Sequence, residues 1–501
     1  MPSPARRRQL GSFYTPADVA DRLVAIALDG LPGEPVVCDP ACGDGVFLLA
    51  AARALARRGV AVATIAHELL WGCDVDAGAV AAARAAIGAW SGVDPGDHLL
   101  VGDGLCVGDR WRDRFDAVVG NPPFLNQLER ATVRRSPLPP ALQPFTKPYT
   151  DTAWLFLVVA RGLVRDGGRV ILVQPQSLVA ARDASSVRDA VAPMLAGLWW
   201  CNDALFDASV RVCAPLLDFG VPSARVRRWS GRDAREIEPI DRIEAPHSAW
   251  SALVPSDVPI TVEAVARPGL VTLASIATAT AGFRDEYYGL QPFVIDEPGG
   301  HLPKLVTSGL IDAGGVSWGE RPTRFGGQRY LHPRVDVDDS RFDGRVRRWV
   351  EQRLVPKVVV ATQTRVVEVA VDARGRWVPS TPVIAVQADP VQLWRVAAAL
   401  SAPAVSAWAM RRHAGAALSP DAIKLSAAQV LEVPLPWDDV AWQRGADALA
   451  AGRLVEAGEA MTRAYGSGDE VFEWWRSRLP AAVTASYCDR VRVGGQGIME
   501  P

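Results

Sequence analysis

The residues best suited to chemistry are Asn121, Pro122, Pro123 and Phe124, which directly follow a short apolar run. Proline fixes φ and lacks a backbone N–H, so the asparagine oxygen and the Pro122 carbonyl stay available as acceptors. An amine conjugated to an aromatic ring is a weak nucleophile because the ring delocalises its lone pair. Two acceptors would localise that lone pair, and Phe124 would offer the ring a flat face. The loop predicts group transfer to an aromatic amine; the alternative is a rigid proline turn.

A glycine-containing loop, residues 39–45, stands between another apolar run and an alanine-rich stretch. Glycine permits close approach to a ligand, and a following helix N-terminus favours a carboxylate. The spacing matches neither common phosphate-binding glycine motif, and an acidic residue suits an ammonium group instead. A ligand with both charges, an amino-acid moiety, fits; the alternative is an ordinary strand-to-helix turn. The candidate contacts are Asp39, Ala41, Cys42, Gly43 and Gly45.

Acidic residues also follow the next two apolar runs. Asp74 stands where a carboxylate can accept both hydroxyls of a ribose; Asp76 is its competitor, and either could instead cap a helix. Asp103, followed by Gly104, could accept from the exocyclic amine of an adenine or serve as a turn aspartate. An amino acid, a ribose and an adenine together make up S-adenosylmethionine, which is the predicted cofactor. No metal is expected.

The elements that must position these residues alternate along the first part of the chain. Predicted strands are 36–38, 65–73, 99–101, 116–119 and 169–173, and predicted helices are 47–58, 77–89 and 151–164. This order is typical of a doubly wound, mostly parallel α/β sheet. The chemistry-bearing residues come at the carboxyl ends of strands, which is the edge where such sheets bind ligands.

The second half of the chain has a different pattern. Residues 270–435 predict short strands, turns and loops, whereas 442–465 and 469–479 predict helices. Within 320–376 there are 13 arginines and lysines against 8 aspartates and glutamates, a net charge of +5 in a chain whose total is −2. Positive charge is therefore concentrated in this stretch.

Composition excludes several classes of protein. The chain of 501 residues is 49% hydrophobic and 22% charged, unlike a disordered tail, a collagen or a small disulfide scaffold. We find no apolar stretch long enough to span a membrane and no signal peptide. The seven cysteines lack paired spacing, so we expect reduced thiols, a cytoplasmic location and no membrane partner.

These motifs, in this order, resemble the gamma-class DNA adenine-N6 methyltransferases of bacterial restriction-modification and phage-defence systems. The resemblance is specific over roughly residues 10–220 and looser beyond them. It implies the class I S-adenosylmethionine-dependent methyltransferase fold followed by a mixed α+β DNA-recognition domain. The segment implied to fold over the methionine part of the cofactor comprises Phe13, Tyr14, Thr15 and Pro16.

The resemblance also assigns the catalytic residues. Residues 121–124 match the catalytic tetrapeptide, whose Asn121 also contacts the cofactor, and residues 151–156 match the helix beside the adenine. Phe124 and Phe206 are implied to stack on the target base. Core packing is the alternative for Phe206.

The implied substrate is an adenine in duplex DNA, which reaches such a pocket only when rotated out of the helix. A second domain must hold the duplex, and arginine suits both phosphate contacts and guanine recognition. The predicted DNA-binding residues are Arg321, Arg324 and Arg329, clustered with Trp318 and His332; the alternative is a solvated loop with a structural tryptophan. Expected domains are a methyltransferase domain over 1–265, a target-recognition domain over 266–435 and a C-terminal helical segment over 436–501.

Two alternatives stay open. Similar Asn-Pro-Pro loops occur in methyltransferases that act on RNA or protein amines, although those enzymes usually lack a long recognition region. A catalytically silent DNA-binding subunit of a defence complex is the second alternative. We expect no fused nuclease, so if restriction accompanies this chain, a separate restriction or defence subunit would carry it.

Overall fold

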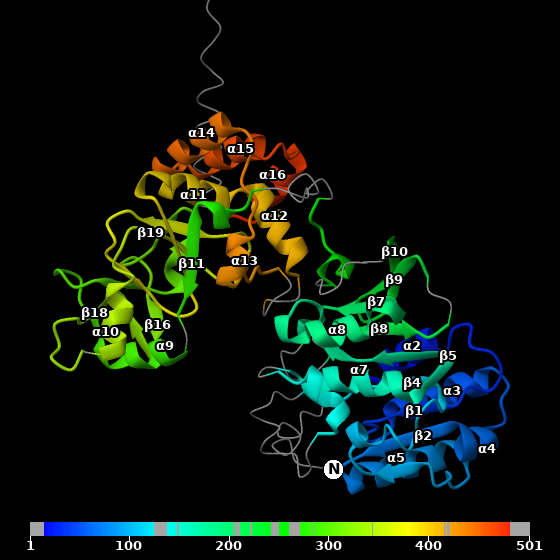
Figure 1. Cartoon of the computed structure of the whole chain (residues 1–501). Helices are drawn as coiled ribbons and strands as arrows, with labels where there is room; N and C mark the ends of the chain where they lie inside the picture. The colour runs from blue at the N-terminus through cyan, green and yellow to red at the C-terminus, as the bar shows by residue number, and fades with distance from the viewer. Residues whose placement is uncertain are drawn as a thin grey trace, which may run out of the picture. The chain divides into compact units, whose positions relative to one another are not determined.

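The computed structural model describes residues 15–124, 138–147, 150–203, 205, 211–220, 223–241, 250–259, 271–282, 284–342, 344–414, 417 and 421–480. The chain divides into two compact units, residues 1–255 and 256–501, and each is described by itself (Figure 1).

The first unit is built around a ten-stranded sheet of order β10-β9-β7-β8-β5-β4-β1-β2-β3, with β6 paired to β8. Its strands are β1 (Val37–Asp39), β2 (Leu70–Asp74), β3 (Leu99–Val101), β4 (Phe115–Gly120), β5 (Val164–Leu172), β6 (Gln174–Pro175), β7 (Leu195–Cys201), β8 (Val212–Asp218), β9 (Arg225–Ser230) and β10 (Arg235–Asp241). Strands β3, β2, β1, β4 and β5 are parallel, whereas β8 runs antiparallel between β5 and β7. The predicted doubly wound, mostly parallel sheet of the class I methyltransferase fold is confirmed.

Helices cover both faces of this sheet. They are α2 (Ala17–Leu28), α3 (Val46–Arg57), α4 (Val62–Thr64), α5 (Ala77–Ser91), α7 (Thr152–Leu163) and α8 (Ser185–Val191). Helices α2, α3 and α5 share one hydrophobic core with the sheet, and α7 and α8 lie on the opposite face (Figure 1). Asp76 begins α5 by accepting from Gly78 N at 2.9 Å, and Gly92 ends it with φ +72°.

One predicted strand of this unit is partly wrong. Residues 65–73 were expected to be extended, but Ile65–Leu69 form a π-helix and β2 begins only at Leu70. Ile65, Ala66 and Leu69 are all buried, so the apolar run reflects burial rather than an extended backbone.

The second unit contains two four-stranded sheets, of order β11-β22-β19-β20 and β12-β18-β13-β21, and two hairpins, β14–β15 and β16–β17. Its strands are β11 (Ala277–Ala281), β12 (Val294–Asp296), β13 (Lys304–Val306), β14 (Ile311–Asp312), β15 (Gly315–Val316), β16 (Thr323–Phe325), β17 (Gln328–Tyr330), β18 (Pro333–Val335), β19 (Lys357–Val360), β20 (Val369–Asp372), β21 (Trp377–Pro379) and β22 (Ile384–Ala388). Its helices are α9 (Arg284–Leu290), α10 (Gly344–Glu351), α11 (Leu393–Ser401), α12 (Pro403–Arg412), α13 (Ala427–Leu431), α14 (Asp439–Ala450), α15 (Leu454–Ala464) and α16 (Asp469–Arg476).

Two larger hydrophobic cores and one smaller cluster, which joins β13 and β14 to β19 and β20, organise the described part of the second unit. One core joins the β11-β22-β19-β20 sheet to the helices α11 to α16, and the other joins the β12-β18-β13-β21 sheet to α9, α10 and the β16–β17 hairpin. The C-terminal helices therefore pack on the first of these sheets rather than forming a core of their own.

The sequence prediction for this unit differs from the structure in two places. Residues 270–435 were expected to hold strands, turns and loops, yet α9, α10, α11, α12 and α13 lie there, and α11 and α12 are almost wholly buried. Residues 442–465 were expected to form one helix, but Gly452, with φ +71°, separates α14 from α15. Glycine adopts this backbone conformation without a Cβ clash, which permits the turn between the two helices.

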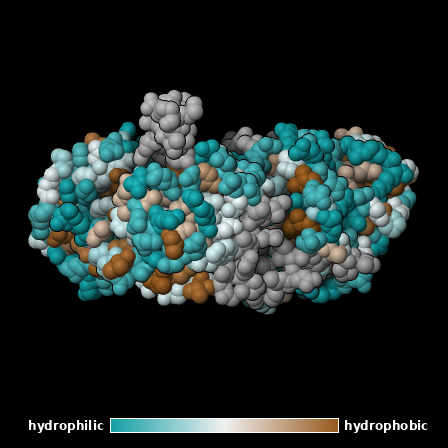
Figure 2. All heavy atoms as spheres, turned by 90° about the horizontal axis from the view of Figure 1, so that it is seen from above, coloured by the Kyte–Doolittle hydropathy of each residue, from teal (hydrophilic) through white to brown (hydrophobic). Residues whose placement is uncertain are grey.

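The outer surface carries few large apolar side chains. On the face drawn in Figure 2, hydrophobic residues lie scattered among hydrophilic ones. Among the described residues, none of the helices combines the length and apolar character needed to cross a membrane.

Candidate active site

The glycine-containing loop lies where β1 ends and α3 begins. Gly45 has φ +89°, and a Cβ there would lie 3.0 Å from the Ala83 Cβ on α5, so glycine allows this close packing. Gly43 has φ +54°, and no atom of the described residues lies within 4 Å of the position a Cβ would take. The loop is therefore tightly packed at one glycine and open to a ligand at the other.

Asp74 lies beside this loop at the end of β2. Its Oδ2 accepts from Gly43 N and its Oδ1 from Asp76 N, both at 2.9 Å. Asp76 instead caps α5, which is the role that the sequence offered as its alternative. A carboxylate has roughly four acceptor positions, so Asp74 keeps acceptor capacity beyond these two contacts.

The third strand contributes the next turn of the same edge. Asp103 Oδ1 accepts from Leu105 N at 3.0 Å, which is the turn contact that the sequence offered as an alternative. A Cβ on Gly104 would lie 1.8 Å from the Pro40 carbonyl oxygen and 3.0 Å from Phe156 on α7. Glycine at 104 thus lets the turn after β3, the loop after β1 and α7 approach one another closely.

The edge formed by these turns is acidic. Asp39 is only 1% exposed, and burial raises its pKa to about 8, helped by the negative charges of Asp74 and Asp44. Burial also raises the pKa of Asp44 and of Asp74. Within the described ranges no arginine or lysine forms an ion pair with any of the three. A positively charged ligand would relieve this repulsion.

The predicted catalytic loop begins at the end of β4, next to this acidic edge. Gly120 has φ +151°, and a Cβ there would lie 2.4 Å from Asp39 Oδ1. Its carbonyl accepts from Val173 N at 2.9 Å, which fixes the strand end against β5. The structure thus brings the glycine-containing loop and the residues 121–124 to one edge of the sheet.

Asn121 is joined to the chain far upstream. Its Nδ2 donates to Thr15 Oγ1 at 3.0 Å, across 106 residues of sequence. Pro122 is buried, and Phe124 is half-buried against the core that includes α2 and α3. Thr15 therefore lies at the predicted catalytic loop and Pro16 directly before α2, whereas Phe13, Tyr14 and Phe206 lie outside the described residues.

Helix α2 begins directly after Thr15 and Pro16. Arginines from four other segments bind it. Asp18 pairs with Arg232 at 2.8 Å and Asp21 with Arg53 at 2.6 Å. Sequence reasoning missed this helix. It also missed the ion pair of Asp18 with Arg232, because these partners are 214 residues apart in the sequence.

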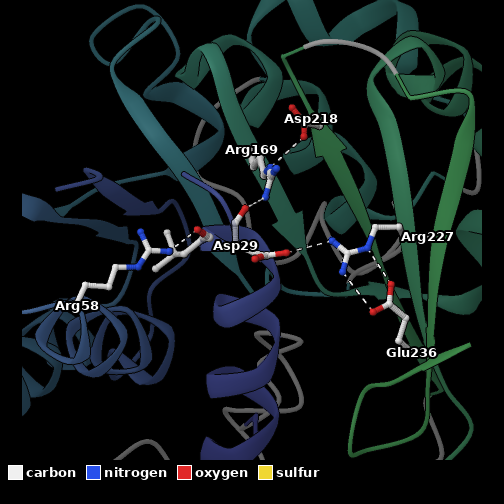
Figure 3. Close-up of polar contacts among 7 residues, drawn as sticks. Asp29, Arg58, Arg169, Asp218, Arg227 and Glu236 are labelled. Atoms are coloured by element: carbon white, nitrogen blue, oxygen red, sulfur yellow. Dashed lines mark hydrogen bonds and ion pairs between the residues drawn. The ribbon is translucent and has the colours of Figure 1, made fainter. Parts of the chain in front are cut away.

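The C-terminal end of α2 has further partners, drawn in Figure 3. Arg227 of β9 pairs with the Asp29 carboxylate at 3.2 Å, and Arg169 of β5 donates to the Asp29 carbonyl. Arg58, which Figure 3 also labels, donates to the carbonyls of Leu28 and Leu31. Arginines at a helix C-terminus satisfy carbonyls that have no partner within the helix.

In the second unit, the structure separates the arginines of residues 320–376 into paired and unpaired groups. Arg321 pairs with Asp312 at 2.8 Å, and Arg341 with Asp339 at 2.6 Å. Arg324 and Arg329 have no acidic partner among the described residues, and they stand directly opposite each other in the β16–β17 hairpin.

This hairpin is held firmly in place. Gly326, at its turn, receives a hydrogen bond from Gln291 Nε2 on its carbonyl at 3.1 Å and donates its N–H to Tyr287 Oη at 2.9 Å. Phe325 is buried against the Tyr287 ring, with ring centroids 4.6 Å apart. Like charges directly opposite in a hairpin are unfavourable without a counter-ion, so the two exposed arginines suit an anionic partner.

Trp318, the aromatic of the predicted cluster, has a structural environment. Its Nε1 donates to the Pro333 carbonyl at 2.9 Å, and Lys304 Nζ lies 4.1 Å from the ring centroid. His332 packs edge-on at 5.3 Å between centroids. These contacts agree with the structural tryptophan that the sequence left as the alternative.

Comparison with known proteins finds relatives of the part of the chain that carries the candidate site. Residues 3–208 match the N-6 DNA methylase family. A stretch of 125 residues is 31% identical to the type II methyltransferase M.MamI of Microbacterium ammoniaphilum, and it covers 23% of this chain and 34% of that protein. The chain thus spans about a third of the length of the curated relative it matches. The family match therefore falls within the first unit.

Two solved structures resemble nearly the whole chain. The type IIL restriction-modification enzyme MmeI, solved in complex with DNA, has a TM-score of 0.56 at 13% identity over 92% of this chain and 75% of that chain. DrdV, also solved with DNA, has a TM-score of 0.52 at 12% identity over 91% of this chain and 58% of that chain. Identities this low establish a shared fold, and the shared fold extends over both units.

Proposed function

We propose that this chain transfers a methyl group from S-adenosylmethionine to the N6 amine of an adenine rotated out of a specific duplex DNA sequence. The observation that carries the proposal is the packing of Gly120 on Asp39, which brings the asparagine-proline loop against a buried, acidic ligand edge. The N-6 DNA methylase match over residues 3–208 supports the same assignment.

The acidic edge fits a cofactor that carries an ammonium, a sulfonium and a carboxylate. Asp39 would receive the ammonium, and the open backbone at Gly43 with the start of α3 would receive the carboxylate. Asp74 would accept the ribose hydroxyls and Asp103 the adenine amine. When bound, S-adenosylmethionine supplies a methyl group activated by positively charged sulfur.

The catalytic loop would hold the target amine. Asn121 Oδ1 and the Pro122 carbonyl would accept its two hydrogens, localising the nitrogen lone pair, while Phe124 would stack on the base. No histidine or glutamate stands in residues 121–124, so this loop acts by positioning and hydrogen bonding.

The second unit would bind the duplex. Arg324 and Arg329, exposed and opposite each other on an anchored hairpin, would contact phosphate or a guanine edge. Arg321 is already paired with Asp312, so we assign it a smaller share of the binding. A separate restriction or defence subunit stays a prediction from the sequence.

The proposal is tested with the full chain and three substrates, duplex DNA, RNA and protein, incubated side by side with labelled S-adenosylmethionine. We expect label in N6-methyladenine of duplex DNA only. Asn121→Ala should abolish transfer, whereas calorimetry should still detect cofactor binding. Label in RNA or protein, or full activity of Asn121→Ala, would contradict the proposal.

A further inference from the structure

Thr15 and Asn121 form a partly buried contact that treats the two ends of the asparagine amide differently. Thr15 is 6% exposed, and its Oγ1 accepts the Asn121 Nδ2 hydrogen at 3.0 Å. An amide presents an acceptor oxygen at one end and a donor nitrogen at the other. Because the nitrogen end is bound to Thr15, the oxygen is the end that points away from the hydroxyl.

This orientation matters because only one end of the amide can serve the proposed reaction. A target amine has hydrogens to donate, so it needs the asparagine oxygen and would be repelled by the NH₂ group. The terminal torsion of asparagine is broad and roughly two-fold, so the side chain alone sets its orientation weakly. A fixed partner on the nitrogen end removes this ambiguity before the substrate arrives.

The hydroxyl is well placed to serve as a fixed partner. Thr15 directly precedes Pro16, whose carbonyl accepts from Val19 N and Ala20 N at the start of α2. Helix α2 is itself fixed by ion pairs to α3 and to the turn between β9 and β10, through Asp21 and Asp18. Its far end is bound by the arginines drawn in Figure 3.

We infer that Thr15 is a positioning residue for methyl transfer: its hydroxyl holds the Asn121 amide with Oδ1 toward the target amine. The inference rests on the proposed function. It differs from the cofactor contact expected of Thr15, because it predicts an effect on turnover at saturating cofactor rather than on cofactor affinity.

The first test compares Thr15→Val, which keeps the shape but removes the hydroxyl, with Thr15→Ser, which keeps the hydroxyl. At saturating cofactor and DNA, Thr15→Val should lower kcat about five- to tenfold, the loss expected for one hydrogen bond in the transition state. Thr15→Ser should restore kcat to within about twofold. Cofactor Kd by calorimetry should stay within about twofold in both variants.

The second test removes the asymmetry itself. Asn121→Asp has two equivalent oxygens, and a threonine hydroxyl can donate to either of them. Adding Thr15→Val to Asn121→Asp should therefore cost less than about twofold in kcat. Thermal unfolding checks that each variant folds. If Asn121→Asp is inactive, the comparison of Thr15→Val with Thr15→Ser decides the inference.

The inference fails if Thr15→Val raises cofactor Kd while kcat at saturation is unchanged, because Thr15 would then be a cofactor contact only. It also fails if Thr15→Ser is as impaired as Thr15→Val, or if Thr15→Val costs the same in both Asn121 backgrounds. Failure of the proposed function is recognised separately, because the unaltered chain would then methylate no adenine in duplex DNA.

Discussion

Gly120 and Asp39 face each other at the ends of two neighbouring strands, and a Cβ on Gly120 would lie 2.4 Å from Asp39 Oδ1. This one contact joins the two loops that the sequence singled out independently, the ligand loop after β1 and the asparagine-proline loop after β4. Side chains larger than hydrogen at 120 would have to displace the buried carboxylate or the strand end.

We therefore expect Gly120→Ala to abolish methyl transfer and to lower the free energy of unfolding by about 1–3 kcal/mol. The matched control is Gly167→Ala, because Gly167 has φ +77° but no described atom within 4 Å of its Cβ position. Gly167→Ala should lower the free energy of unfolding by about 1 kcal/mol through backbone strain alone and should keep methyl-transfer activity. Denaturant unfolding and a methylation assay measure both. Equal activity of the two variants would contradict the steric argument.

Asp39 predicts an unusual dependence of stability on pH. In the unfolded chain its pKa is near 3.8, whereas burial raises it to about 8 in the folded protein. Between these values the folded state holds a proton that the unfolded state has lost, so stability should fall as pH rises. The contribution of this one group to the free energy of unfolding is at most about 6 kcal/mol.

The measurement is denaturant unfolding of the ligand-free protein at several pH values, compared with Asp39→Asn. The substituted protein cannot ionise at this position, so its stability should fall less between pH about 4 and 8. Identical slopes for the two proteins would show that Asp39 keeps an ordinary pKa.

The β16–β17 hairpin gives a prediction for DNA binding. Each arginine that contacts a phosphate contributes about 0.9 to the slope of log affinity against log salt concentration. Replacing Arg324 and Arg329 together by glutamine should weaken binding of duplex DNA and lower the slope by about 2. Arg341→Gln is the control, since Asp339 already neutralises Arg341. A salt slope unchanged in the double variant would exclude phosphate contacts by this hairpin.

The buried pair of Lys357 and Asp372 gives a prediction for the second unit. Lys357 Nζ lies 2.5 Å from Asp372 Oδ2, and neither side chain is more than 2% exposed. Lys357→Met would leave a buried carboxylate without its cation, although Arg376 N and Trp377 N still donate to it. We expect a loss of about 3–5 kcal/mol in unfolding free energy.

Lys424→Met, at an exposed position, should change stability by less than about 0.5 kcal/mol. Thermal and denaturant unfolding of both variants check the pair. A Lys357→Met protein as stable as the control would mean that the two charges contribute little to folding.

Sequence reasoning placed most strands of the parallel sheet in the first unit well, because short apolar runs followed by glycine or aspartate are typical of buried strands that end in a turn. It failed where local pattern and tertiary packing diverge. The buried run Ile65–Leu69 is a π-helix, and the small apolar residues of α11 and α12 gave no clear helical period. The hydrogen bond between Thr15 and Asn121 could not be predicted from any local sequence pattern, because the two residues are 106 positions apart.

The β9–β10 hairpin comes later in the chain than every strand that carries a predicted cofactor or catalytic motif. Its arginines nevertheless form ion pairs at both ends of α2, with Asp18 and Asp29. It thereby supports the helix that begins beside Thr15, the residue that contacts the proposed catalytic Asn121. A shortened chain that ended after β8 would keep residues 39–45 and 121–124 and still lose this support.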